Sequence, residues 1–399
     1  MKSNFNKILT FALAFIICLI FIGASGGRTY GSGEVPDPLG SWSQINSLVA
    51  RPAGWKQIVT DTSAFQWGGI SKDPYKTDIY NYSGCNGGSH TSKYYDLDYG
   101  TYPLIDGSTV LVPMAAEFAW QYLDFSNEFT RTFVHFNTTS DAYYRLILDP
   151  AKENLESYRA ESSGVPTYGK KNTTTYYRTI GKKTDIVLAT YPSVEQLDYA
   201  EKHGVSLVIE PVCYDSFVFI TRGDNPVDSL TVEQVQKIYS GEITNWQEVG
   251  GDDLEIVAYQ REKNSGSQTA MEEMVMQGMQ MTKPPMAQVA AGMGRLIDVV
   301  AGYEDGDYES DRMSIGYTYK YYVDRLYTSN DIKILKIDGV TPSDENVRNG
   351  SYAFIASYNA VIRAEDINAT GGKFMNWMLS DEGQRCIAQA GYVTLLSLT

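Results

Sequence analysis

The sequence of 399 residues has only three histidines and four cysteines, and they are widely separated. Transition-metal sites need several such ligands at close spacing, so a dedicated metal site is not expected. Positive charge is also scarce, because 33 Lys and Arg stand against 48 Asp and Glu, for a formal net charge of -15. Nucleic-acid binders need a basic footprint for the phosphate backbone, which excludes this class of partner.

No disulfide framework is visible either. Beyond the N-terminal region the chain holds Cys85, Cys213 and Cys386, which are far apart and odd in number. Cys213 follows apolar residues in an expected strand, and we expect it to be buried. The hydrophobic share of 43% excludes a disordered chain, and the length exceeds what one compact core holds. Two domains are therefore expected.

Only one long apolar run occurs, and it lies at the N-terminus. Lys2 and Lys7 precede the run, which extends from Ile8 to Ala24. A basic start, an apolar stretch and a small residue at its end are typical of a secretory signal cleaved after Ala24. The run is also just long enough for an uncleaved membrane anchor, and this alternative stays open. Cys18 follows an isoleucine, where a lipoprotein signal has a small residue, so the sequence has no lipobox. We expect an extracytoplasmic protein that is secreted, periplasmic or held at the cell surface.

From residue 102 onward, apolar runs alternate with helical periodicity, which predicts an α/β fold with largely parallel sheets. The expected strands are Ser108–Pro113, Phe133–Phe136, Asp185–Ala189, Leu254–Tyr259, and the pair Val205–Ile209 and Ser216–Ile220, broken by Pro211. The expected helices are Ala115–Phe125, Asp141–Leu148, Ser193–His203, Thr231–Tyr239 and Gln268–Met281. Thr231 and Gln234 predict a capping box for the fourth helix.

Two segments stand outside this alternation. Residues 25–95 indicate an irregular extension rather than a domain. Residues 148–185 form a polar insertion that carries the basic residues Lys170, Lys171, Arg178, Lys182 and Lys183. A solvated surface loop is the favoured interpretation of this insertion, and a basic rim that attracts an anion is the alternative.

The clearest chemistry lies in the loop that follows the strand Leu254–Tyr259. Arg261 comes at the end of the strand, and Ser265, Gly266 and Ser267 stand directly before a helix. Free backbone N–H groups at a helix start, hydroxyl donors and a planar guanidinium suit a tetrahedral oxyanion. The alternative is an ordinary serine cap beside a surface arginine. No Gly-Lys-Ser/Thr occurs in this loop, so nucleotide hydrolysis has no support.

Two further hydroxyl-rich segments precede expected helices. They are Asp106–Thr109 and Asn137–Ser140. Either could serve only as a helix cap. In open α/β sheets, however, such loops gather at the carboxyl ends of strands, where ligands bind.

These segments carry a family resemblance. The stretches YSGEITNWQEVGG at 239–251 and YQREKNSGSQT at 259–269 resemble the phosphate-type substrate-binding proteins of bacterial ABC importers. Further similarity follows in the same order at 105–113, 185–193, 217–227, 314–322 and 379–392. The resemblance covers roughly residues 100–399.

The resemblance implies an α/β, two-lobed periplasmic-binding-protein (Venus-flytrap) fold of the class II type. We expect residues 1–24 as signal or anchor, 25–95 as the extension, 96–211 with 351–399 as lobe 1, and 212–350 as lobe 2. The family's function implies capture of phosphate, or a related tetrahedral oxyanion, for an ABC permease in the membrane. The implied ligand residues are Ser108, Thr109, Thr139, Ser140, Arg261, Ser265, Gly266 and Ser267. No cofactor, metal or catalytic residue is implied, and we expect a monomer.

One position departs from the family pattern. Thr190 aligns with an Asp that accepts the proton of bound hydrogen phosphate in typical members, which leaves sulfate or another oxyanion open as the ligand. Asp106 or Asp215 could substitute for that carboxylate.

Two other function classes compete with importer-linked capture. A membrane-anchored anion sensor of the same fold would bind a ligand without transport. An enzyme would need a nucleophile with a base, but His90, His135 and His203 are dispersed.

Overall fold

The computed structural model describes residues 49–67, 100–127, 130, 133–134, 136, 138–148, 184–285, 288–290, 292–302 and 312–395. The N-terminal apolar run, Cys85, the basic residues of the polar insertion, His90 and His135 lie outside these ranges. Within them, no helix has the length and apolar character needed to cross a membrane.

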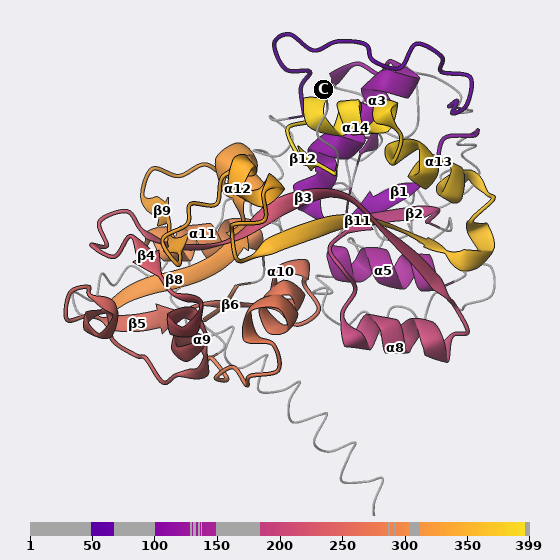
Figure 1. The fold of residues 1–399 in the computed structure, drawn as a ribbon. Coiled ribbons are helices and arrows are strands. Elements are labelled where there is room, and N and C mark those ends of the chain that lie inside the picture. The colour runs from indigo at the N-terminus through magenta and orange to yellow at the C-terminus, as the bar shows by residue number, and fades with distance from the viewer. Residues whose placement is uncertain are drawn as a thin grey trace, which may run out of the picture. The chain divides into compact units, whose positions relative to one another are not determined.

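The described chain forms a mixed α/β fold around a continuous sheet with strand order β1-β2-β11-β3-β8-β5 (Figure 1). Its strands are β1 (Ile105–Gly107), β2 (Ile186–Ala189), β3 (Leu207–Arg222), β5 (Glu255–Ala258), β8 (Arg312–Tyr319), β9 (Ile332–Ile334), β11 (Ile355–Arg363) and β12 (Val393–Thr394). Two smaller parallel pairs join β4 (Ser229–Leu230) to β10 (Lys336–Ile337), and β6 (Gln260–Arg261) to β7 (Val289–Ala290).

The helices surround this sheet. The α-helices are α3 (Val112–Leu123), α5 (Thr139–Ile147), α8 (Val194–Lys202), α9 (Val232–Ser240), α10 (Gly266–Ala270), α11 (Met293–Ala301), α12 (Asp344–Arg348), α13 (Thr370–Met378) and α14 (Asp381–Gln389). Shorter 3-10 turns are η3 (Thr109–Leu111), η4 (Trp246–Val249) and η8 (Ala364–Asp366), and π-helical turns are η5 (Met271–Met276) and η7 (Tyr322–Leu326).

Strand β3 belongs to both halves of the sheet. Its residues Leu207–Ser216 pair with β11, and Phe217–Arg222 pair with β8 and β9. All of these pairings are antiparallel, while β1–β2 and β5–β8 are parallel. The expectation of largely parallel sheets is therefore wrong, because β3, which both halves of the sheet share, runs antiparallel to its neighbours.

The half of the sheet around β2 is covered on both faces. Val187 and Ala189 pack with α5, and Leu188 points into the other cluster together with Phe374 of α13. Figure 1 shows α5 and α8 below β11 and β2, with α3, α13 and α14 above. A strand buried on both faces is apolar at every position, as the run Ile186–Ala189 is.

Local signals at helix ends predict several elements correctly. The expected helices at 141–148, 193–203 and 231–239 correspond to α5, α8 and α9. Thr231 and Gln234 form the predicted capping box at the start of α9. Cys213 is buried, as predicted.

Two expected strands differ from the structure. Ser108–Pro113 is not a strand but η3 and the first residues of α3, where proline is favoured in the first turn. Phe133 is helical rather than extended, and it packs edge-on against Phe125 and Trp67. The apolar residues of Phe133–Phe136 thus reflect burial rather than pairing, and the strand prediction there is wrong.

Pro211 does not break β3. The register of the β3–β11 pair shifts between Tyr358 and Asn359, and Asn359 lies opposite Pro211. The missing N–H is tolerated at this irregularity. The helix expected to reach Met281 ends instead at Met276, because Gln277 and Gly278 have positive φ angles.

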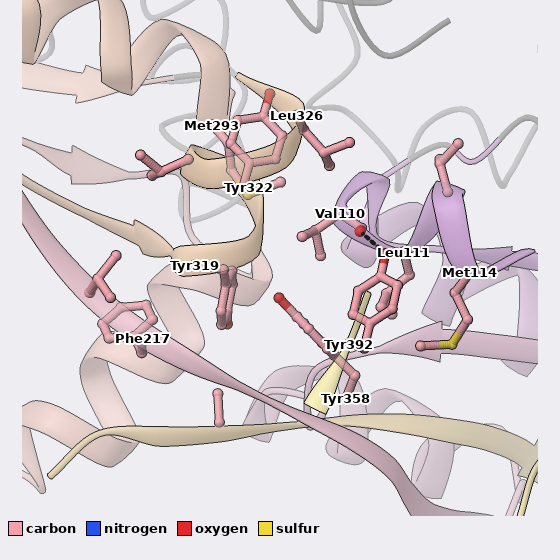
Figure 2. Close-up of a cluster of buried hydrophobic side chains, with 14 of the residues drawn as sticks. Val110, Leu111, Met114, Phe217, Met293, Tyr319, Tyr322, Leu326, Tyr358 and Tyr392 are labelled. Carbon is pink, nitrogen blue, oxygen red and sulfur yellow. Dashed lines mark hydrogen bonds between the residues drawn. The ribbon is translucent and has the colours of Figure 1, made fainter. Parts of the chain in front are cut away.

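An aromatic cluster fills the junction between the halves of the sheet. Figure 2 shows Tyr319 of β8, Tyr358 of β11 and Tyr392, which donates a hydrogen bond to Val110 O at 2.7 Å. The rings of Tyr319 and Tyr358 are 5.4 Å apart between centroids. Within this cluster, Tyr358 donates to the buried carboxyl of Asp215 at 2.9 Å.

Residues 49–67 run without helix or strand along α3 and α14. Trp55 Nε1 donates to Glu117 Oε2 at 2.9 Å, and Val59 N donates to Gln121 Oε1 at 3.0 Å. Phe65 inserts its ring beside Phe374, with 4.9 Å between centroids. This segment completes the core on one face of the sheet.

Candidate functional site

The first loop leaves strand β1 at Gly107. A Cβ atom at this position would overlap Leu188 O, so the close approach of β1 to β2 requires glycine. Ser108 N then donates to the same carbonyl at 2.9 Å. Ser108 is buried and Thr109 half-buried at the start of the helical segment. Both therefore lie at the carboxyl end of β1, beside the end of β2.

The second loop starts helix α5. Thr138 caps it by accepting from Asp141 N at 3.1 Å. Thr139 is buried and Ser140 half-buried, and both lie in the first turn, where backbone N–H groups have no intrahelical acceptor. Thr138, not Thr139, therefore does the capping, which leaves the hydroxyl of Thr139 for another partner.

The third loop connects β6 to α10. The backbone N–H of Arg261 donates to Gln268 Oε1 and to Tyr317 Oη, and its Nε donates to Ala290 O at 2.9 Å. Its Nη1 is buried without a hydrogen-bond partner among the described residues. Ser265 caps α10 by accepting from Gln268 N at 3.3 Å, as the alternative reading expected for a helix-start serine. Gly266 and Ser267 are buried in the first turn.

The second and third loops meet. A Cβ atom built on Gly266 would lie 2.5 Å from Thr190 Oγ1 and 3.2 Å from Thr139 Oγ1. Tyr319 donates to Gly266 O at 3.0 Å from the opposite side. The structure thus brings Thr139 and Gly266 together at the end of β2, and Ser108 stands beside Leu188 on the same edge. Among the described residues, no hydrogen bond joins Thr109, Ser140 or Ser265 to another of these loops.

Contacts beside this meeting point hold the third loop against α8. Ser193 Oγ donates to Asn264 Oδ1 at 3.0 Å, and Gln196 Nε2 reaches Asn264 O at 3.4 Å. Lys263 pairs with Glu195. Asn264 adopts a left-handed backbone conformation with φ of 64°, which asparagine tolerates better than most residues.

The charges at the site favour an anion. Burial lowers the pKa of the Arg261 guanidinium, which is 8% exposed. No carboxylate pairs with it among the described ion pairs. A buried guanidinium without a carboxylate is costly unless an anionic ligand pairs with it.

Neither carboxylate considered as a substitute for the family aspartate is free to serve. Asp106 Oδ2 is 2.6 Å from Arg145 Nη1, and its Oδ1 accepts from Gly107 N at 2.8 Å. Asp215 accepts from Ser216 N at 2.7 Å and from the Tyr358 hydroxyl in the aromatic junction. Both carboxyl groups are committed to structural partners.

Sequence reasoning missed the residues that support the site. Gln268 and Tyr317 fix the Arg261 backbone, and Tyr319 fixes Gly266. The alternation of Tyr317 and Tyr319 along β8 was the available signal, since it places both rings on one face. His203 lies at the end of α8, where its Nδ1 is 2.8 Å from Tyr199 O. In the described part of the chain, no cluster of side chains has the composition of a metal site.

Comparison with known proteins identifies the family. Residues 135–382 match the model of the PBP superfamily domain. The phosphate-binding protein PstS of Borreliella burgdorferi is 25% identical over 190 residues, which cover 45% of this chain and 63% of the relative. PstS of Bacillus subtilis is 25% identical over 204 residues, which cover 50% of this chain and 62% of the relative. The match thus spans less than two thirds of the length of either relative.

A solved structure supports the same assignment. The protein is from Clostridium perfringens, is described as a phosphate ABC transporter substrate-binding protein, and carries bound phosphate. It aligns with a TM-score of 0.50 and 26% identity, over 73% of this chain and 98% of its own. The predicted resemblance and the two-lobed α/β fold are confirmed. Because the family model matches more than half of the chain, the protein belongs to the PBP superfamily.

Proposed function

We propose that the protein captures phosphate, or a related tetrahedral oxyanion, between its two lobes and delivers it to an ABC importer. The observation that carries this proposal is the buried Arg261, whose Nη1 has no partner among the described residues. The neutral donors of Gly266 and Ser267 follow Arg261 on the same loop, and Thr139 Oγ1 approaches Gly266. Such a site binds a dianion through fixed dipoles and one cation, and it does so despite the overall acidity.

The remaining parts of the proposal rest on the relatives and on the N-terminal sequence. Proteins named phosphate-binding protein PstS match this chain over about half its length. Lys2, Lys7 and the apolar run after them support an extracytoplasmic location with a signal or anchor. We also propose that no reaction follows binding, and that Ser108, Thr109, Ser140 and Ser265 complete the ring of donors.

Calorimetric titration of the purified protein with phosphate tests the proposal. Arg261→Ala should weaken binding by about 100-fold or more, because a charge-assisted bond in a buried site is lost. Arg312→Ala is the matched control, since Arg312 is exposed and pairs with Glu255 at 3.0 Å. We expect its affinity to be unchanged. Equal affinities of the wild type and Arg261→Ala would refute the site.

A further inference from the structure

A buried ion pair joins helix α5 to strand β1. Arg145 Nη1 donates to Asp106 Oδ2 at 2.6 Å, and the two side chains are 3% and 1% exposed. Among the ion pairs of the described residues, it is the one in which both side chains are almost fully buried. Replacing such a pair by apolar residues often leaves a protein equally stable or more stable, so stability alone does not explain this pair.

The pair lies close to the donors proposed for the anion. Ser108 follows Asp106 by two residues, which is about 7 Å of extended chain. Asp106 lies on the face of β1 that α5 covers, since it contacts Arg145. Thr139, whose Oγ1 approaches Gly266, begins the same helix. The charge of Asp106 therefore acts on any anion that these loops hold.

A second carboxyl group lies near the pair but has other compensation. Asp141 is half-buried, one helical turn before Arg145. Burial raises the pKa of Asp141, the charge of Arg145 opposes this rise, and the nearby Asp106 adds to it. Asp141 also accepts from water and lies in the first turn of α5, where the helix dipole favours negative charge. Asp106 lies in a strand, so the cation that cancels its charge is Arg145.

We propose that Arg145 is a positioning residue of the anion site, and that it acts by cancelling the negative charge of Asp106 beneath the first loop. This inference rests on the proposed function of the same site. The Asp106 carboxylate accepts from Gly107 N at 2.8 Å and so fixes the backbone at the end of β1. Without Arg145 the same carboxylate would repel the ligand, because unit charges at this separation interact strongly in a partly buried site.

Calorimetric titrations of three variants with inorganic phosphate test the inference. Arg145→Gln leaves the charge of Asp106 uncancelled and should weaken binding by about 10- to 100-fold. Asp106→Asn removes the negative charge and keeps Arg145, so phosphate should bind as tightly as in the wild type or up to about tenfold tighter. The double variant Asp106→Asn/Arg145→Gln removes both charges, and its affinity should return to within about threefold of the wild type.

A purely structural role of the pair predicts a different pattern. Both single variants would then weaken binding by similar factors, and that result would overturn the inference while the proposed function stands. Wild-type affinity in Arg145→Gln, or a double variant as weak as Arg145→Gln, would overturn it as well. If Arg145→Gln does not fold, Asp106→Asn should still bind phosphate about tenfold tighter than the double variant, and equal affinities of these two would refute the role of Arg145. Absence of phosphate binding by the wild type would refute the proposed function itself.

Arg363→Gln is the matched control for the loss of a buried guanidinium. The Arg363 side chain is 2% exposed and pairs with Asp366 at 2.8 Å. It donates to Thr184 O at 3.1 Å, at the amino end of β2 and thus at the edge of the sheet opposite to the candidate site. Arg363→Gln should therefore lower the melting temperature and leave the phosphate affinity unchanged. An equal loss of affinity in Arg363→Gln and Arg145→Gln would show that general destabilisation, and not the charge of Asp106, weakens binding.

Discussion

Replacing Gly266 by alanine tests how closely the two halves of the site approach each other. The new Cβ atom would lie 2.5 Å from Thr190 Oγ1, whereas ordinary contact begins at about 3.4 Å. Thr190 is β-branched and buried, so its side chain has few rotamers into which it can turn away. Relief of about 0.9 Å therefore requires the loop that carries Gly266 to withdraw from β2.

The expected cost follows from this overlap. Overpacking of a close contact costs about 1–3 kcal/mol, which corresponds to about 5- to 150-fold weaker anion binding if only the closed form is affected. The same change places alanine in a helical turn, where it is favoured over glycine by about 0.5–1 kcal/mol. We therefore expect Gly266→Ala to lose affinity while the melting temperature of the ligand-free protein stays constant or rises.

Calorimetry and thermal unfolding without ligand together measure these two effects. Gly223→Ala is the matched control, because its nearest neighbours, atoms of Asp331, would lie at an ordinary 3.5 Å from the new Cβ. In a Thr190→Ala background the cost of Gly266→Ala should shrink, since the clashing oxygen is gone. Wild-type affinity in Gly266→Ala would show that these loops do not close on one another in the bound state.

Three further changes test other contacts. Asn264→Gly keeps the left-handed backbone but removes the hydrogen bond that Ser193 Oγ donates to the Asn264 side chain. Anion affinity measured by calorimetry should then fall by about 2- to 10-fold, while the melting temperature stays unchanged. An unchanged affinity would show that this hydrogen bond does not support the bound arrangement of the third loop. Burial raises the pKa of Asp215 to about 7, so its contribution to stability is present below the unfolded pKa and is lost as the pH rises to 7. Denaturant unfolding from pH 4 to 8 should show this loss in the wild type and not in Asp215→Asn, and parallel curves would refute it. Gly107→Ala forces a Cβ against Leu188 O and should lower the free energy of unfolding by about 3 kcal/mol in urea titrations, whereas a wild-type midpoint would contradict the close approach of β1 to β2.

The sequence predicted the elements whose cause is local. Helix α9 follows from the capping residues Thr231 and Gln234 and from an apolar face, all within one short segment. The strand prediction for Ser108–Pro113 was wrong, because these residues begin a buried helix instead. A short apolar run does not by itself distinguish a buried strand from a buried helix. The chain could not reveal the antiparallel pairing of β3 with β11, since that pairing depends on segments far apart in sequence.

In the candidate site too, residues that are close in sequence could be predicted, whereas contacts between distant segments could not. Arg261, Gly266 and Ser267 stand close together in sequence, and a resemblance could identify them as a group. The approach of Thr190 to Gly266 joins the end of one strand to the start of a distant helix, so only the folded chain reveals it. Ser265 also meets a local need, as the cap of α10.

The sharing of β3 by both halves of the sheet has a mechanical consequence. Strand β3 has 16 residues and is hydrogen-bonded to its neighbours on each side of the junction, so it bends more easily than it slides. Bending β3 out of the sheet plane leaves its hydrogen bonds intact, whereas a shift of its register by one residue would turn its buried side chains to the other face. We therefore expect the two halves of the sheet to move relative to each other by bending of β3 rather than by sliding along it.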